Sequence, residues 1–204
     1  MSEFDEKARG WDADPARVER ARVVAEAIRE QVPLDDTMRV LDYGCGTGLL
    51  GFALLPHAAH VTFADTSEGM LEIVREKLAA LGSANADVLL LDLTSEPPPA
   101  ERYDVIASLM TLHHVEDVDM ILRRFRTLCS PRATLCIADL EREDGSFHGS
   151  GFTGHHGFER ESLAAAARRA GFHPVAYQTV HVMTRETEEG VKNYPLFLLT
   201  GRTV

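Results

Sequence analysis

Apolar positions along the chain alternate between short continuous runs, typical of buried strands, and three-to-four-residue repeats, typical of helices. The runs predict strands at Arg39–Asp42, His60–Asp65, Val88–Leu91, Tyr103–Ser108 and Thr134–Ala138. The repeats predict helices after Asp14-Pro15, from about Leu49, over Glu68–Leu81, at about Val118–Cys129 and over Arg160–Ala170. Strands that alternate with helices in this way indicate a mostly parallel sheet covered on both faces.

The C-terminal part departs from this alternation. A polar, glycine-rich and histidine-rich loop is expected at Glu141–Gly157, and two further strands, Val175–Met183 and Pro195–Thr200, predict a closing hairpin. The expected fold class is therefore α/β, doubly wound, with a mostly parallel seven-stranded sheet and an antiparallel C-terminal hairpin. We expect one domain over 1–204, in which 1–38 is an N-terminal helical segment or lid, 39–140 the ligand-binding half, and 141–204 the loop, helix and closing strands.

Composition narrows the function classes. With 45% apolar residues, 204 positions fill one ordinary core. A net charge of −11 disfavours nucleic acid as a partner, and the basic stretch Arg123–Arg126 is explained by a solvated helix face. The three cysteines form no CxxC pair, the first residues do not resemble a leader, and no run approaches the ~20 apolar residues of a membrane span. We therefore expect a cytoplasmic protein without membrane insertion; its oligomeric state is left open.

Three acids mark a candidate ligand site, because each lies at or just after the end of a predicted strand. They are Asp42, Asp65 and Asp92. Ligands of open α/β sheets bind beyond the carboxyl ends of the strands. A glycine-dense turn follows Asp42, and Asp65 lies about 20 residues further on, where an acid can bind ribose hydroxyls. Each acid alone has an ordinary explanation as a turn residue, but their order and spacing together predict a nucleotide-type site.

A dinucleotide site is the competing interpretation, since Gly46–Gly51 satisfies the pattern G-x-G-x-x-G. Asp42 argues against it, because a carboxylate there would face pyrophosphate. Repulsion at ~5 Å with an effective dielectric constant of ~20 costs about 3 kcal/mol per charge pair. The acid favours instead a ligand that carries an ammonium and a sulfonium, and a nicotinamide oxidoreductase remains the less favoured alternative.

Four segments resemble the motifs of class I S-adenosylmethionine-dependent methyltransferases. They are VLDYGCGTG at 40–48, FADTSEGML at 63–71, LLLDL at 89–93 and YDVIASLMTLHHVED at 103–117. The resemblance covers essentially the whole chain and is closest to the small-molecule branch that includes ubiquinone and menaquinone biosynthesis methyltransferases. It implies a Rossmann-like fold, S-adenosylmethionine as the cofactor and S-adenosylhomocysteine as the product.

The same resemblance implies which residues bind the cofactor: Asp42, Tyr43, Gly44, Cys45, Gly46, Gly48, Asp65, Thr66, Met70, Asp92, Leu93 and Ser108. In this scheme Asp42 and the glycine turn hold the methionine part and Asp65 the ribose. Asp92 and Leu93 lie at the adenine, and Ser108 offers its backbone carbonyl to the ammonium. Met70 alone is also explained as a core residue. The segment from Phe4 to Trp11 is either a lid over the site or an anchor for the first long helix.

Methyl transfer requires an aligned nucleophile and often a base, and histidine suits the second task. His113 and His114 follow the fourth strand and are the candidate catalytic residues, although both are also explained as residues that pack or cap the next helix. His148, His155 and His156 are explained either as a metal site or as solvated loop histidines. The loop lacks a cysteine partner and His-x-x-x-His spacing, so no metal site is predicted.

The expected function is methyl transfer to a small-molecule acceptor at O, N, C or S, in an apolar pocket lined by Leu109, Met110, Leu112 and Phe152. The residues at Ser108–His113 lack the Asn/Asp-Pro-Pro-aromatic motif of enzymes that methylate nucleic-acid amino groups. The alternative is a non-catalytic module or partner subunit that binds S-adenosylmethionine without turnover.

Overall fold

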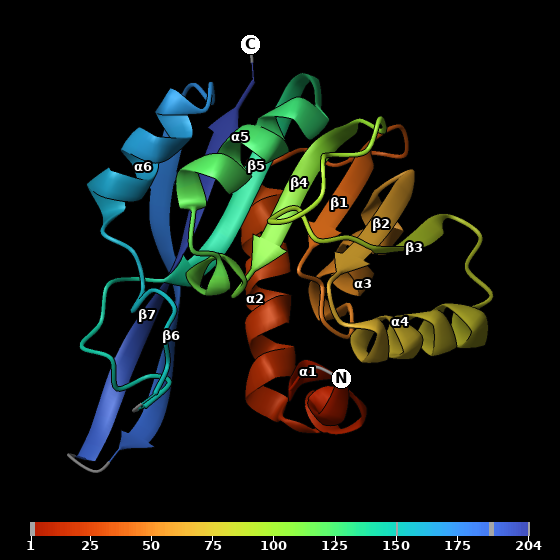
Figure 1. The fold of residues 1–204 in the computed structure, drawn as a ribbon. Coiled ribbons are helices and arrows are strands. Elements are labelled where there is room, and N and C mark those ends of the chain that lie inside the picture. Colours follow the sequence, from red (N-terminus) through yellow and green to blue (C-terminus); the bar gives the residue numbers. More distant parts are fainter. Residues whose placement is uncertain (1–2, 150, 188–189, 204) are drawn as a thin grey trace.

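A computed structural model describes residues 3–149, 151–187 and 190–203 (Figure 1). Within these residues one seven-stranded sheet has the order β3-β2-β1-β4-β5-β7-β6. Its strands are β1 (Arg39–Tyr43), β2 (His60–Asp65), β3 (Ala86–Leu90), β4 (Tyr103–Leu109), β5 (Cys129–Leu140), β6 (Val175–Thr187) and β7 (Gly190–Arg202). The helices are α1 (Glu3–Lys7), α2 (Pro15–Gln31), α3 (Leu49–Leu54), α4 (Glu68–Leu81), α5 (Val118–Leu128) and α6 (Arg160–Arg169), with 3₁₀ turns η1 (Ala8–Ala13), η2 (Leu55–His57) and η3 (Leu112–His114).

Five neighbouring strands of the sheet, β3, β2, β1, β4 and β5, are parallel to one another. In contrast, β7 is antiparallel to both of its neighbours, β5 and β6. From β1 the next strands along the chain, β2 and β3, lie on one side, and β4 and β5 lie on the other. The ends of β1 and β4 therefore flank the crevice where such sheets bind ligands. The predicted fold class, including the antiparallel hairpin, is confirmed.

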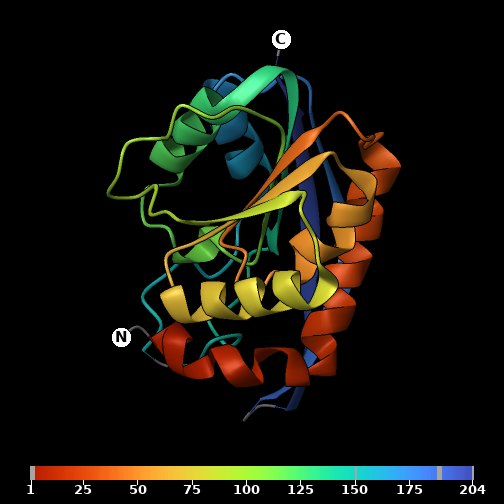
Figure 2. The same cartoon turned by 90° about the vertical axis from the view of Figure 1, so that its right-hand side faces the viewer.

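Alternating strand residues separate two hydrophobic layers. Leu41 and Tyr43 of β1 face the cluster formed with α5 and α6, while Val40, the residue before them, faces the cluster formed with α2, α3 and α4. Figure 2 shows α5 and α6 on one side of the sheet and α2 on the other. Full burial of each large apolar side chain stabilises the fold by about 1.5–3 kcal/mol, and these layers hold the strand ends rigidly in place.

Local signals in the sequence set several helix ends. The Asp14 side chain accepts a hydrogen bond from the amide of Ala16 at 2.9 Å, and Pro15 occupies the first helical position of α2. At α4, the Ser67 hydroxyl accepts from the amide of Met70 at 3.2 Å. Gly82, with φ +63°, ends the same helix in the left-handed conformation.

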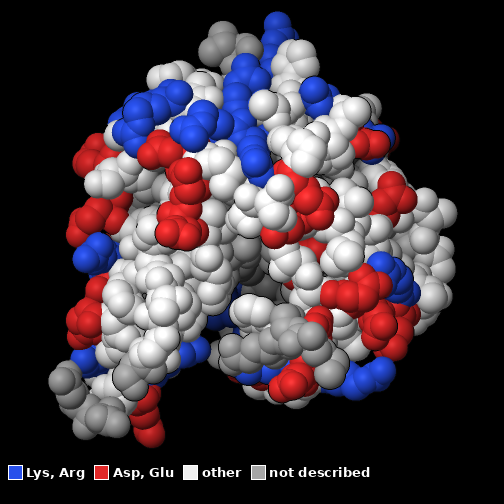
Figure 3. Space-filling view, in the orientation of Figure 1, with Lys and Arg blue, Asp and Glu red and all other residues white. Residues whose placement is uncertain are grey.

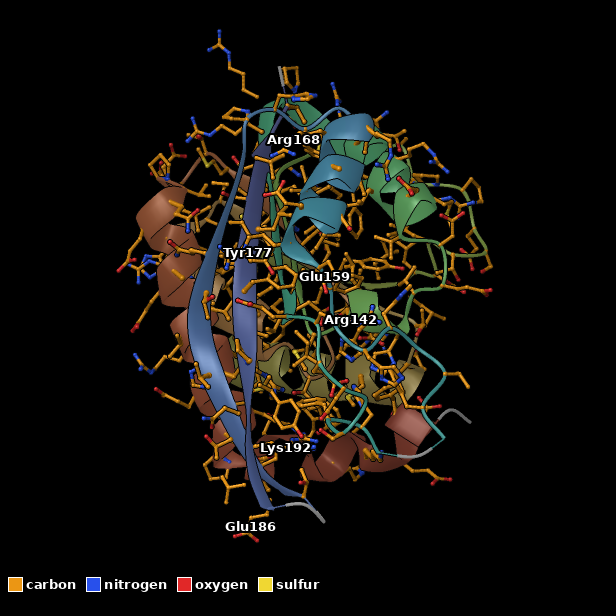
Figure 4. All side chains as sticks on the ribbon, turned by 90° about the vertical axis from the view of Figure 1, so that its left-hand side faces the viewer. Arg142, Glu159, Arg168, Tyr177, Glu186 and Lys192 are labelled. Carbon is orange, nitrogen blue, oxygen red and sulfur yellow. The ribbon has the colours of Figure 1, made fainter. Side chains whose placement is uncertain are left out.

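The sequence placed some strand ends wrongly. β3 lies at Ala86–Leu90 and not at Val88–Leu91, and β5 begins at Cys129, before an irregular stretch that contains Arg132 with φ +65°. The β6–β7 hairpin is also longer than predicted. Its far half pairs only within the hairpin, and its exposed polar side chains do not show the alternation of apolar residues that predicts a strand. Figure 4 shows Glu186 and Lys192 toward the free end of this hairpin.

The N-terminal segment α1–η1 lies along α4 (Figure 2). A carboxylate oxygen of Asp5 accepts from the Ser67 hydroxyl at 2.5 Å and from the Gly69 amide at 3.0 Å. Asp12 accepts from the Thr47 hydroxyl and pairs with Lys77, both at 2.5 Å. Two acids thus fix this segment to the glycine turn and to α4. Among the described residues, none of the helices combines the length and apolar character needed to cross a membrane.

Candidate active site

A cavity of about 860 Å³ opens beyond the carboxyl ends of β1, β2, β3 and β4. The N-terminal segment and α2 form a second wall, and the loop after β5 forms a third. Figure 3 shows this hollow between the two halves of the molecule, with blue side chains visible inside it. A volume of this size is in the range of small-molecule sites, about 300–1,000 Å³.

The glycine turn after β1 forms one end of the cavity. Gly44 and Gly46 have φ of +69° and +54°, which favours glycine at both positions. A Cβ atom at Gly44 would lie 2.2 Å from Cγ2 of Thr111, so the turn packs directly against the end of β4. At Gly46 the nearest atoms to such a Cβ are Nε1 of Trp11 at 3.8 Å and the sulfur of Met70 at 4.0 Å. The turn therefore has room for a ligand between these two side chains.

Asp42 is 1% exposed and lines the cavity from below the turn. Its Oδ2 accepts a hydrogen bond from the Gly51 amide at 2.8 Å. Burial raises the pKa of Asp42 to about 7, and the nearby Asp65 adds to this rise. The sequence predicts a fully ionised Asp42, but near neutral pH this buried carboxyl is ionised only in part unless a cation occupies the cavity.

Asp65, at the end of β2, also lines the cavity. One carboxylate oxygen accepts from the Ser67 amide at 2.9 Å and the other from the Gly46 amide at 2.7 Å. Burial raises the pKa of Asp65 as well. Because each carboxylate oxygen has two lone pairs, the group keeps capacity for hydroxyl donors of a ligand while it holds the turn.

Asp92, Thr66 and Met70 complete this end of the cavity. The Asp92 carboxylate accepts hydrogen bonds from Thr94 and Ser95 at 2.6–2.8 Å, so it also has the ordinary turn role that an acid at a strand end suggests. Met70 is 1% exposed and belongs to the start of α4, where its sulfur faces the glycine turn.

Four residues expected at the site do not line the cavity. Leu93 is fully buried, and its amide donates to the Tyr43 hydroxyl at 3.2 Å. The Ser108 hydroxyl donates to the Tyr43 carbonyl at 2.9 Å, and the next residue, Leu109, reaches the cavity in its place. The remaining two are Gly48, where a Cβ would meet Phe52 and Phe63, and Leu112, which lies in the core with α5.

His113 lies at the opposite end of the cavity, and an acid that the sequence analysis missed holds it in place. Its Nδ1 is 2.7 Å from Oδ1 of Asp139, at the end of β5, and its amide donates to Oδ2 of the same residue at 3.2 Å. Both side chains are at most 1% exposed. With Nδ1 bonded to Asp139, Nε2 is buried and has no hydrogen-bond partner within the part of the chain that the structure describes.

The rings of His114 and His148 lie beside His113, with centroid distances of 4.2 and 4.9 Å. Phe152 stacks on His148 at 4.0 Å. All four residues line the cavity, together with Leu109 and Met110. This end therefore combines apolar walls with three imidazole rings.

The other two histidines of the loop contact other groups. Nε2 of His155 lies 2.9 Å from the Val115 carbonyl, and Nδ1 of His156 lies 3.4 Å from the Glu143 carboxylate. The loop that Figure 4 shows between Arg142 and Glu159 thus brings only His148 to His113 and His114. The three-histidine group considered from the sequence, His148 with His155 and His156, does not form.

Three arginines also line the cavity and were not predicted: Arg17 and Arg20 of α2, and Arg185 of β6. Arg17 pairs with Asp14 at 3.4 Å and lies over the Trp11 ring at 3.9 Å. Arg20 has no carboxylate partner among the described residues; its Nη1 contacts the Met183 sulfur at 3.2 Å and its Nε is unpaired. Burial, and then the charges of Arg17 and Arg185, lower the pKa of Arg20 to about 10. A ligand with an anionic group would therefore complement the positive charge of this wall.

Comparison with known proteins gives the family. A methyltransferase domain model matches residues 16–177. An uncharacterised methyltransferase of Schizosaccharomyces pombe is 29% identical over 62% of this chain and 50% of its own length. A ubiquinone biosynthesis O-methyltransferase of Bordetella avium is 30% identical over 82% of this chain and 76% of its own. The chain thus spans about half the length of the first of these relatives.

Solved structures share the fold. A putative methyltransferase from Haloferax volcanii, solved in complex with the Trm112 methyltransferase activator, has a TM-score of 0.76 at 19% identity and covers 100% of this chain and 98% of its own. A phosphoethanolamine N-methyltransferase of Haemonchus contortus, solved with S-adenosyl-L-methionine, has a TM-score of 0.73 at 14% identity, over 100% of this chain and 60% of its own. The chain has the domain and the fold of class I methyltransferases, the class that uses S-adenosylmethionine. More particularly, this chain belongs to the methyltransferase domain family whose model it matches.

Proposed function

We propose that this chain transfers the methyl group of S-adenosylmethionine to a small molecule with an acidic hydroxyl. The observation that carries the proposal is that one cavity runs from the glycine turn to His113, whose buried Nε2 has no hydrogen-bond partner among the described residues. The turn and its acids suit a cationic nucleoside, and the histidine end suits a group that must lose a proton.

Donor binding is assigned to the end of the cavity nearest β1 and β2. Asp42 and the turn at Gly44 and Gly46 would hold the methionine part, and Asp65 the ribose hydroxyls. Trp11 and Met70 flank the open side of the turn and would enclose the ligand. Bound there, S-adenosylmethionine supplies a methyl group on a positively charged sulfur, which a nucleophile displaces in line.

Acceptor activation is assigned to His113. Asp139 fixes the ring through Nδ1 and leaves Nε2 as the atom that faces the acceptor. Leu109, Met110 and Phe152 exclude water around it, which strengthens the interaction between the ring and a developing oxyanion. The ubiquinone biosynthesis O-methyltransferases among the relatives support oxygen as the accepting atom.

Arg20 indicates that one of the bound ligands carries a negative charge. Arg20 is half-buried and its Nε is unpaired among the described residues, so a ligand carboxylate there would offset part of the cost of removing the charge from water. We therefore assign an anionic group of the bound ligands to this wall. Two sources share this chemistry, the amino-acid carboxylate of the methyl donor and a carboxylate on the acceptor.

The test is a turnover assay that detects S-adenosylhomocysteine release with phenols, hydroxybenzoates, quinols, thiols and amines as acceptors. We expect product with at least one hydroxyl acceptor and a loss of about 100-fold in kcat for His113→Asn, with His57→Asn, outside the cavity, as the matched control. Preference for amines or thiols would overturn the oxygen assignment. Cofactor binding without turnover on any acceptor would favour a non-catalytic module.

A further inference from the structure

We infer that His113, His114 and His148 form a binding site for one divalent transition-metal ion at the acceptor end of the cavity. Each histidine offers one ring nitrogen, and these nitrogens lie within 4.8 Å of one another. They come from two segments far apart in sequence, η3 and the loop after β5, so the fold itself brings them together. This trio differs from the loop histidines considered from the sequence.

The state of His113 points to a ligand at Nε2. Its Nδ1 lies 2.7 Å from a fully buried carboxylate, so Nδ1 carries the proton and Nε2 presents a lone pair. Among the described residues that lone pair is buried without a hydrogen-bond partner, whereas most buried polar atoms in proteins have one. A carboxylate that fixes the distal nitrogen of a metal-binding histidine is the usual outer-shell arrangement and raises the basicity of the ligand.

The spacing fits an ion after a small movement. Zinc–nitrogen bonds of about 2.0–2.1 Å in a tetrahedron place the nitrogens ~3.3 Å apart, so the widest pair must close by roughly 1.5 Å. His148 can supply this movement, since it lies between Gly145 and Gly149, with φ of +92° and +80°. Imidazole suits zinc, copper, nickel and iron, and does not suit magnesium or calcium.

Three histidines leave the fourth position open toward the cavity, which is the pattern of catalytic metal sites; structural sites are closed by four protein ligands. The role of the ion rests on the proposed function: with the ion on Nε2, His113 would act as its ligand and not as a free base, and an acceptor hydroxyl at the open position would bind the ion and have its pKa lowered. The binding of the ion does not depend on that role and is tested separately.

The experiment is titration of the chelator-treated full chain with cobalt(II) and zinc, read by the visible absorption of cobalt and by calorimetry. We expect one ion per chain. His148→Ala should abolish the cobalt spectrum, and Asp139→Asn should weaken binding about 10- to 100-fold. His156→Gln is the matched control, because His156 lies in the same loop with its Nδ1 3.4 Å from the Glu143 carboxylate, and it should bind as the wild type does. Circular dichroism verifies that each variant is folded.

Wild-type protein that binds no ion, or His148→Ala with unchanged affinity, would overturn the inference. Affinity that falls equally in His148→Ala and His156→Gln would also overturn it, because the loss would then follow from the loop and not from the ligand. Binding of S-adenosylhomocysteine by the same metal-free samples separates these outcomes from failure of the proposed function, since donor binding does not use the three histidines.

Discussion

At the scale of single residues, Asp42 is a carboxyl group whose ionisation depends on what fills the cavity. Its folded-state pKa of about 7 lies above the unfolded value, so the folded apoprotein favours the neutral form. Its contribution to stability is therefore fully present below about pH 4 and is lost as the pH rises through about 7. A cationic cofactor has the opposite effect, because it favours the ionised form.

We predict that Asp42→Asn removes much of this pH dependence. Urea unfolding of the apoprotein should show wild-type stability falling by about 2–4 kcal/mol between pH 5 and pH 8. The variant should lose less over the same range and bind S-adenosylmethionine at least about 10-fold more weakly. Parallel stability profiles for the two proteins would show that Asp42 does not titrate in this range.

Arg20 carries the second residue-scale prediction. We expect Arg20→Met to leave the apoprotein at least as stable as the wild type, because it removes a half-buried charge that has no carboxylate partner among the described residues. Affinity should fall about 10-fold for whichever ligand supplies the anion. Calorimetry with S-adenosylhomocysteine and with methylthioadenosine, which lacks the carboxylate, separates the sources.

If Arg20→Met lowers the affinity for S-adenosylhomocysteine but not for methylthioadenosine, Arg20 is assigned to the methyl donor. Unchanged binding of both nucleosides, with a raised KM for the acceptor, assigns it to the acceptor. If neither nucleoside affinity nor KM changes, no anion binds at Arg20. The control is Arg22→Met, also on α2, where the guanidinium bonds Glu19 and Glu26 at the surface.

At the scale of elements, the close contact of α3 with the sheet depends on Gly51. A Cβ there would lie 2.3 Å from the Phe63 ring and 2.8 Å from Oδ2 of Asp42. We predict that Gly51→Ala destabilises the protein by about 1–3 kcal/mol through overpacking and weakens cofactor binding by displacing Asp42. Gly10→Ala, at a site with no atoms within 4 Å, should change stability by less than about 0.5 kcal/mol in the same denaturation experiment. Equal effects of the two substitutions would contradict the packing argument.

The N-terminal segment is the second element with a testable role. Phe4, Lys7 and Trp11 line the cavity, and Asp5 joins this segment to α4. We predict that Asp5→Ala speeds amide hydrogen exchange over residues 3–13, and that S-adenosylhomocysteine slows exchange there in the wild type. Glu6→Ala removes a neighbouring exposed acid and is the control. If neither the ligand nor the substitution changes the rate of amide hydrogen exchange over residues 3–13, the segment is an anchor and not a lid.

At the scale of the whole molecule, local signals predicted most of the architecture. Asp14-Pro15, Ser67 and Gly82 mark helix ends because capping is a matter of neighbouring residues. Asp42 and Asp65 could be placed at one edge of the sheet because parallel strands end on the same side. The β6–β7 hairpin was underestimated because its outer half has no buried face, and without one the alternation of apolar residues disappears.

The acceptor end depends on contacts between distant segments, which periodicity does not report. Asp139 ends an apolar strand just as Asp42 does, so the same signal could have identified it. No local pattern places His148 beside His113, because a long loop determines that contact. Likewise, Arg17 and Arg20 read as ordinary helix residues until the fold turns that face of α2 toward the cavity.

The central claim, that this cavity binds the methyl donor, is tested most directly by titration calorimetry with S-adenosylhomocysteine. The account predicts one site in the wild type and affinity about 10- to 100-fold weaker in Asp65→Ala, because charge-assisted hydrogen bonds are lost. Asp87→Ala, an exposed acid on β3 with its side chain 69% accessible, should bind as the wild type does. Absence of binding by the wild type at millimolar ligand, or equal affinity in Asp65→Ala, would contradict it.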